Sequence, residues 1–345
     1  MAETSTIEWT DATWNPITGC SIVSPGCTNC YAMKLAGTRL KHHPSREGLT
    51  IVPKARGAEG GTPDRDRKKS PVWNGKVRLN TDWLDQPLRW KRPRMIFVCA
   101  HGDLFHESVP DEWILDVFTV MAAAPQHTFQ VLTKRGERMH DFVSRPDLLE
   151  DIYANWYTFS GSAPEVWSWP LHNVWLGCSA EDQKRYDERR YWLDHTPAAV
   201  KFWSIEPMLG PIDMKIEFVK PDWVIVGGES GDGARPMHTD WARSLRDQCA
   251  SSGVPFFFKQ WGEYLPVGQV LPGFGRVHGG TAVVPGRMKL HYGGTPTQPP
   301  QHLYADRGVD VAATPDGALT FGVGKKAAGR LLDGVEHNGM PEAAR

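Results

Sequence analysis

Short apolar runs recur along the chain at intervals that suit buried strands. Seven of them are rich in β-branched and aromatic residues, and they cover residues 76–79, 95–99, 128–132, 174–178, 200–205, 223–226 and 255–258. Their apolar positions are continuous rather than alternating, which is typical of parallel strands covered on both faces. Segments with helical character lie between them, at residues 111–123, 183–195 and 239–251.

This alternation of strand and helix predicts an α/β fold with a parallel (β/α) barrel, complete or nearly so. The segment that leads into the first cysteines is expected to supply a further strand, which brings the count to about eight. We assign residues 1–265 to the barrel, with an inserted loop at about 42–74. Residues 266–345 form a Gly- and Pro-rich C-terminal extension that ends in a short helix, expected at residues 325–332.

Polar residues follow most of the predicted strands. The catalytic candidates among them are Asp103, His106, Lys134, Glu181 and Lys259. Because the carboxyl ends of barrel strands open onto one face, we expect Asp103, Lys134, Glu206 and Glu229 to share a rim with the first cysteines. The alternative for any single position is a cap on the following helix. Glu206 precedes a proline and Glu229 follows two glycines, so these two are the hardest to explain as caps.

Composition and charge limit the partners. The chain has 345 residues with 39 Lys and Arg against 40 Asp and Glu, a balance that neither requires nor excludes a polyanionic partner. The insertion at 42–74 is rich in basic residues, and we weigh contact with phosphates there against a simple solvated loop. No long apolar segment or leader pattern is seen, so we expect a cytoplasmic protein with no membrane partner.

Three of the six cysteines, Cys20, Cys27 and Cys30, lie within eleven positions and have the spacing C-x6-C-x2-C. Thiolates suit zinc, copper(I) and iron–sulfur clusters. A structural zinc site usually has four protein ligands, and the loop offers three, although His42 and His43 lie a helix away. Three ligands on a four-iron four-sulfur cluster leave one iron open for a cofactor or substrate. We predict such a cluster, with structural zinc as the alternative.

The cysteine segment also resembles a known cluster loop. The run N-P-x-x-G-C followed by C-x2-C-Y resembles radical S-adenosylmethionine (SAM) proteins close to spore photoproduct lyase, whose own motif is C-x3-C-x2-C. The matching positions are Asn15, Pro16, Gly19, Cys20, Cys27, Cys30 and Tyr31. Along nearly its full length the chain resembles an uncharacterised family of phage and prophage proteins with this three-cysteine motif.

The resemblance implies a function. The open iron is expected to bind the amino and carboxylate groups of SAM, and an electron donor is expected to drive SAM cleavage to a 5′-deoxyadenosyl radical. Our candidates for SAM contacts are Gly227, Gly228, Glu229, Ser230 and Glu206. The implied substrate is a nucleobase, nucleotide or nucleic acid. The alternative is a non-catalytic phage protein that holds zinc or iron–sulfur and binds DNA or a protein.

Overall fold

The structure is a computed structural model that describes residues 5–53, 70–160, 168–216, 219–266, 269, 280–284, 288–293, 302–305, 310–313 and 319–342. The centre of the predicted insertion, residues 54–69, lies outside the described residues. Contact clustering divides the chain into two compact units. Unit 1 comprises Met1–Cys178 and Arg189–Lys201, and unit 2 comprises Ser179–Glu188 and Phe202–Arg345. The sequence-based boundary near residue 265 stays a prediction.

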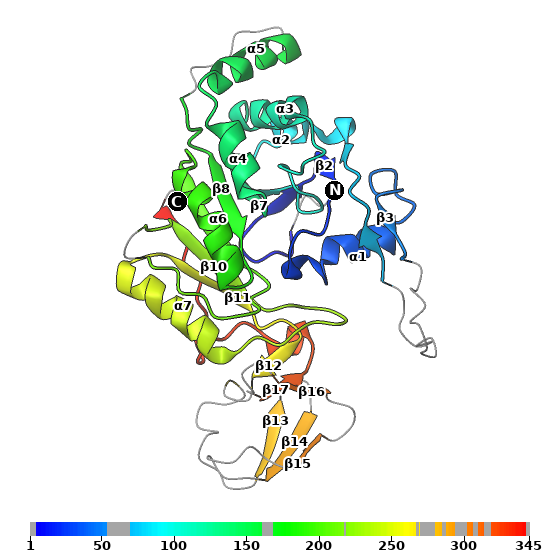
Figure 1. Cartoon of the computed structure of the whole chain (residues 1–345), viewed down its shortest axis with the longest axis vertical. Helices are drawn as coiled ribbons and strands as arrows, with labels where there is room; N and C mark the ends of the chain where they lie inside the picture. Colours follow the sequence, from blue (N-terminus) through cyan, green and yellow to red (C-terminus); the bar gives the residue numbers. More distant parts are fainter. Residues whose placement is uncertain are drawn as a thin grey trace. The chain divides into compact units, whose positions relative to one another are not determined.

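The main sheet has seven strands in the order β1-β6-β7-β8-β9-β10-β11. It is parallel and curls into a half-barrel. Figure 1 labels β7, β8, β10 and β11 of this sheet. The strands are β1 (Ala12–Trp14), β6 (Met95–Val98), β7 (Thr128–Thr133), β8 (Val174–Ser179), β9 (Val200–Ile205), β10 (Trp223–Gly227) and β11 (Phe256–Gln260). The prediction of a parallel α/β fold is confirmed, and so is the strand before the cysteines.

The barrel is not complete, because the predicted strand at 76–79 does not join this sheet. Only β5 (Arg78–Leu79) forms there, and it pairs antiparallel with β2 (Ile17–Thr18). Lys76 and Arg78 alternate with apolar residues, and a strand covered on both faces cannot bury two such cations. The prediction that residues 76–79 form a strand of the main sheet was therefore wrong.

Eight α-helices lie within the described residues. They are α1 (Tyr31–Gly37), α2 (Gln86–Arg89), α3 (Asp111–Ala122), α4 (Gly136–Val143), α5 (Leu148–Ser160), α6 (Gln183–His195), α7 (Thr239–Ser252) and α8 (Lys325–Ala328). Two short 3₁₀ helices occupy Pro25–Cys27 and Thr81–Trp83. The three helices expected from the sequence, α3, α6 and α7, agree with prediction to within one residue at each end. None of the described helices is both long and apolar enough to cross a membrane.

Small antiparallel sheets complete the described elements. β3 (Thr50–Ile51) pairs with β4 (Val72–Trp73). In the C-terminal segment, β12 (Tyr264–Pro266), β16 (Asp310–Ala313) and β17 (Leu319–Gly322) form one three-stranded sheet, and β13 (Gly280–Val284), β14 (Met288–Gly293) and β15 (His302–Ala305) form another. The sequence predicted only a short helix in this region, and that helix, α8, ends four residues earlier than expected.

Each unit has an aromatic core. In unit 1, Trp14 and Phe129 are fully buried and their rings lie 5.8 Å apart. In unit 2, Trp223 packs between Phe202 and Phe257 at 5.7 and 6.1 Å. The tryptophans beside the strands are thus packed in the interior. Cys99, Cys178 and Cys249 are also buried, as expected for small apolar side chains.

Candidate functional site

The cysteine loop begins where β1 ends, beside the carboxyl end of β6. Trp14 accepts a backbone hydrogen bond from Cys99, and Gly19 donates one to His101. Gly19 has a φ of +97°, and a Cβ on it would lie 2.2 Å from the carbonyl oxygen of Lys76. Glycine is therefore required at this position, immediately before Cys20. The side-chain oxygen of Asn15 accepts from the amide of His101 and ties the loop to the same strand end.

Cys27 and Cys30 are placed by local backbone structure. Cys27 ends the 3₁₀ helix Pro25–Cys27, and its amide bonds to the Ser24 carbonyl. Cys30 donates to the carbonyl of Cys27 and caps α1. The hydroxyl of Tyr31 donates to the carbonyl of Ala100 at 2.8 Å, so the start of α1 is also joined to the segment after β6.

Arg135, at the carboxyl end of β7, contacts the first cysteine. Its Nη1 donates to the Sγ of Cys20 at 3.5 Å and to the Oδ2 of Asp103 at 3.0 Å. Its Nη2 donates to the Ser21 hydroxyl at 2.7 Å. The side chains of Arg135 and Asp103 are each 7% exposed, so the ion pair is shielded from water. One guanidinium thus joins the cysteine loop to the ends of β6 and β7.

Asp103 is the acceptor that organises this region. Its Oδ1 accepts from the Thr133 hydroxyl at 2.7 Å and from the amide of Phe105. Its Oδ2 accepts from the amide of Lys134 at 3.2 Å, in addition to Arg135. The carboxylate thus has partners on both oxygens, as a buried charge requires. Asp103 is therefore held in place by partners on both oxygens.

His106 and Glu107 flank Arg135 on its other side. The Nδ1 of His106 accepts from the amide of Ser108, so Nε2 carries the proton and donates to the Ser21 hydroxyl at 3.0 Å. Glu107 accepts from Nε and Nη2 of Arg135 at 3.1 and 3.3 Å, and its side chain is 60% exposed. Ser21 therefore accepts from both Arg135 and His106.

Burial and charge set the protonation states here. Burial, and then the charge of Asp103, raise the pKa of the Cys20 thiol to about 12, while Arg135 opposes the shift. Burial works against the Arg135 cation, yet the charge of Asp103 and the hydrogen bond to Glu107 hold its pKa above its usual value. Burial and Arg135 lower the pKa of His106, so its neutral form is favoured. In the metal-free protein the Cys20 sulfur is a thiol, and binding a metal requires loss of its proton.

The cysteine loop offers three thiols as possible metal ligands. All three cysteines are free and half-buried. Within the described ranges, no three His, Cys, Asp or Glu side chains are grouped to hold one metal ion. Three thiolates can serve as three of the four ligands of a zinc ion, or as the three protein ligands of a four-iron cluster with one iron left open.

A second polar group lies in unit 2, at the ends of β9 and β11. Lys259 donates to both oxygens of Glu206 at 2.8 and 3.0 Å, and Gln260 donates to Glu206 at 3.4 Å. A Cβ on Gly227 would lie 3.3 Å from the Glu206 carboxyl, so this residue leaves room for the carboxylate. The Oε1 of Gln260 is buried and has no described hydrogen-bond partner.

A third group surrounds Arg235, also in unit 2. The Oε2 of Glu229 accepts from the Nε and the amide of Arg235 at 2.8 Å each, and Oε1 accepts from Nη2 at 2.6 Å. This bond, together with the charges of Glu229 and Glu181, raises the pKa of Arg235. A Cβ on Gly228 would lie 1.9 Å from the carbonyl oxygen of Trp261, so Gly228 permits a close backbone approach within the protein.

The structure therefore brings the sequence candidates into separate groups. Asp103, His106 and Lys134 lie with the cysteine loop in unit 1, as expected, and Lys134 takes part through its amide. Glu181, Glu206, Gly227, Gly228, Glu229, Ser230 and Lys259 belong to unit 2, and a rim shared with the cysteines stays a prediction. Sequence reasoning missed Ser21, Glu107 and Arg235, although each lies next to or within a quoted motif.

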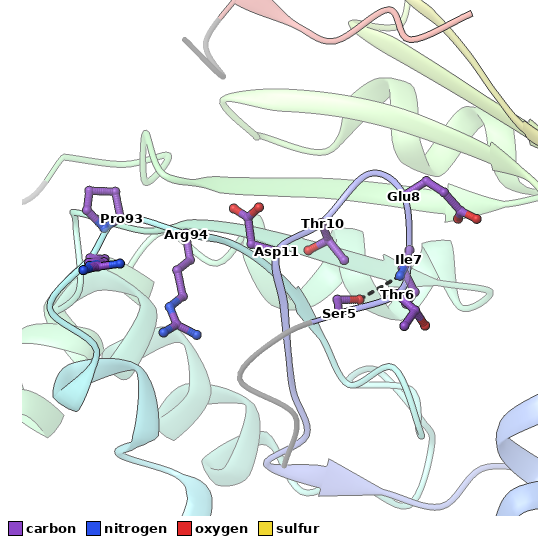
Figure 2. A pocket seen from close by; sticks show the side chains of 9 residues that line it. Ser5, Thr6, Ile7, Glu8, Thr10, Asp11, Pro93 and Arg94 are labelled. Atoms are coloured by element: carbon purple, nitrogen blue, oxygen red, sulfur yellow. Dashed lines mark hydrogen bonds between the residues drawn. The ribbon is translucent and has the colours of Figure 1, made fainter. Parts of the chain in front are cut away.

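A surface hollow lies at the other end of the unit 1 strands (Figure 2). It is lined by Ser5, Thr6, Ile7, Glu8, Thr10, Asp11, Arg92, Pro93 and Arg94. Asp11 directly precedes β1 and accepts from the amide of Met95, the first residue of β6. The hollow is thus at the amino ends of these strands, whereas the cysteine loop follows their carboxyl ends. It is not part of the cysteine site.

Comparison with known proteins identifies the family. Residues 4–341 match the family described as "Protein of unknown function (DUF5131)". The chain belongs to this family. The expected likeness to an uncharacterised family over nearly the whole length is confirmed, while the phage origin and the likeness of DUF5131 to radical SAM proteins stay predictions. No curated protein and no solved structure matches the chain.

Proposed function

We propose that this DUF5131 chain is a radical SAM enzyme whose Cys20, Cys27 and Cys30 hold a four-iron four-sulfur cluster. The observation that supports it is the link from Arg135 to the Cys20 sulfur at 3.5 Å. This link holds a loop of three free thiols at the carboxyl ends of parallel strands, where α/β enzymes place their reacting groups. When bound, such a cluster would supply one electron, taken from the electron donor, for the cleavage of SAM to methionine and a 5′-deoxyadenosyl radical.

The chain's own residues have distinct tasks in this proposal. Asp103 holds Arg135, and Arg135 with Ser21 holds the first cysteine in place. His106, neutral and donating from Nε2, is the second donor to the Ser21 hydroxyl after Arg135, so Ser21 keeps its own proton to donate within the cysteine loop. Burial of the Arg135–Asp103 pair keeps water from the Cys20 side of the loop, which protects radical chemistry from side reactions.

For SAM we propose contacts from the second unit. Glu206, held by Lys259, offers a carboxylate for an ammonium or a ribose hydroxyl. Glu229 is fully engaged by Arg235, so its part is to fix that guanidinium, which in turn is suited to a carboxylate. Gly227 and Ser230, at and just after the carboxyl end of β10, are further proposed SAM contacts.

The substrate class follows from the resemblance of the cysteine loop to photoproduct-lyase-like proteins and of the chain to phage proteins. We propose a nucleobase, nucleotide or nucleic acid as the substrate and an electron donor as a further partner, both in the cytoplasm.

The test is SAM cleavage. Full-length protein reconstituted anaerobically with iron and sulfide is incubated with SAM and dithionite, and 5′-deoxyadenosine is measured by mass spectrometry. We expect the wild type and Cys249→Ala to form 5′-deoxyadenosine and Cys30→Ala to form none. Wild-type protein that binds stoichiometric zinc and no iron would instead support the structural, non-catalytic alternative.

A further inference from the structure

We infer that Arg135 and Glu107 set the reduction potential of the cluster, with opposite signs, and so control when the site accepts an electron. This inference rests on the proposed function. It assigns Arg135 the role of a positioning and tuning residue that acts on the cluster through Cys20.

The contact itself is direct and shielded. Nη1 of Arg135 donates to the Cys20 sulfur at 3.5 Å, and the Arg135 side chain is 7% exposed. Reduction adds negative charge to a cluster and its thiolates. Hydrogen bonds to the sulfurs and nearby positive charge stabilise that added charge and raise the potential. In a poorly hydrated setting these interactions are stronger than in water. Arg135 therefore favours the reduced state.

Glu107 acts against it. Its two oxygens bind Nε and Nη2 of Arg135, on the part of the guanidinium that does not face Cys20. Its charge reduces the net positive field that Arg135 exerts. Because the Glu107 side chain is 60% exposed, the carboxylate can be neutralised without disturbing a packed core.

A matched control pair joins α4 to α3. Arg138 in α4 donates to Asp111 at 2.8 Å and to the carbonyl of Val109. Neither Arg138 nor Asp111 hydrogen-bonds to a cysteine of the loop. The pair has the same chemistry as Arg135 with Glu107, and it lacks the link to Cys20.

The experiment is a redox titration of the reconstituted full-length chain, with the reduced fraction followed by electron paramagnetic resonance at fixed ambient potentials. We expect Arg135→Gln to lower the ratio of reduced to oxidised cluster about tenfold, which is 59 mV for one electron. Glu107→Gln should raise the same ratio at least about twofold. Arg138→Gln and Asp111→Asn should leave it unchanged. If the two substitutions only loosened the loop, they would not shift the reduction potential in opposite directions.

Failures of the two proposals are distinguishable. If the wild-type protein takes up no iron, the proposed function itself is contradicted. A wild-type cluster that is reducible, with the wild-type potential retained in both Arg135→Gln and Glu107→Gln, overturns this inference alone. If Arg135→Gln does not hold a cluster, Glu107→Gln decides, and an unchanged or lowered potential in that variant contradicts the inference.

Discussion

Arg135 and Cys20 are 115 positions apart in the sequence, and the guanidinium donates a hydrogen bond to the sulfur at 3.5 Å. The same guanidinium forms a buried ion pair with Asp103. The contact therefore connects the loop after β1 with the ends of β6 and β7. The position of Cys20 therefore depends on the ion pair between Arg135 and Asp103.

The buried pair gives a stability prediction. Arg135→Ala leaves Asp103 buried without its cation, and breaking a buried pair in this way costs about 3–5 kcal/mol in the free energy of unfolding. Lys184→Ala, which removes an exposed ion pair with Glu188 on α6, should cost less than about 1 kcal/mol. Chemical denaturation of both variants checks the difference, and equal losses would contradict the buried-pair account.

His101 gives a pH prediction. Arg46 donates to its Nδ1 at 2.7 Å, and burial, followed by the charge of Arg46, lowers the pKa of His101 to about 4. The ordinary value is about 6.5, so the unfolded chain binds more protons between these limits. The contribution of neutral His101 to the free energy of unfolding is therefore fully present above about pH 6.5, and it is lost as the pH falls toward 4.

The measurement is the free energy of unfolding between pH 4 and 7 for the wild type and His101→Asn, which keeps an acceptor for Arg46. We expect the wild type to lose about 1–3 kcal/mol more than the variant over this window. Parallel pH profiles for the two proteins would show that His101 titrates normally.

Gly228 gives a packing prediction. A Cβ there would lie 1.9 Å from the Trp261 carbonyl oxygen, whereas one on Gly210 would lie 3.4 Å from the Cβ and 3.9 Å from the Cα of Asp182, which are ordinary contact distances. We expect Gly228→Ala to lower the free energy of unfolding by about 1–3 kcal/mol or more, and Gly210→Ala by less than about 0.5 kcal/mol. Denaturant unfolding decides, and a Gly228→Ala protein of wild-type stability would refute the close approach.

Glu229 and Arg235 give a binding prediction. Because both oxygens of Glu229 bind Arg235, the two residues act as one unit. We expect Glu229→Gln to weaken SAM binding roughly tenfold, about 1.4 kcal/mol, and Arg235→Gln to do so at least equally. The double variant should lose less than the sum.

Calorimetry with SAM on reconstituted protein tests the Glu229 prediction. Asp240→Asn is the matched control, since Asp240 pairs with Arg243 on exposed α7 surface. Unchanged affinity in Glu229→Gln would remove this carboxylate and its arginine from the SAM site.

The parallel strands were predictable because each one is a continuous apolar run of neighbouring residues. A run such as residues 223–226 is short, apolar throughout and rich in β-branched residues, which is the pattern of a strand buried on both faces. The failure at residues 76–79 also has a local cause, since Lys76 and Arg78 interrupt the run. The strands from β12 onward were missed because a Gly- and Pro-rich composition hides short antiparallel pairs.

The site was predictable only in part. The spacing of Cys20, Cys27 and Cys30 is visible in the sequence because one short loop holds all three. The partners of Cys20 are not, since Arg135 and Asp103 reach it only through the folding of β6 and β7. The pairing of Glu229 with Arg235 depends on the turn after β10, which no periodicity reveals.

Iron and sulfide content after anaerobic reconstitution tests the central claim most directly. We expect about four irons and four sulfides for each wild-type chain and for Cys249→Ala, whose buried cysteine lies in α7. Cys20→Ala, Cys27→Ala and Cys30→Ala should each lose the broad violet absorption and most of the iron. Full iron and sulfide loading in all three single variants, or stoichiometric zinc with no iron in the wild type, would contradict the assignment of the cluster to this loop.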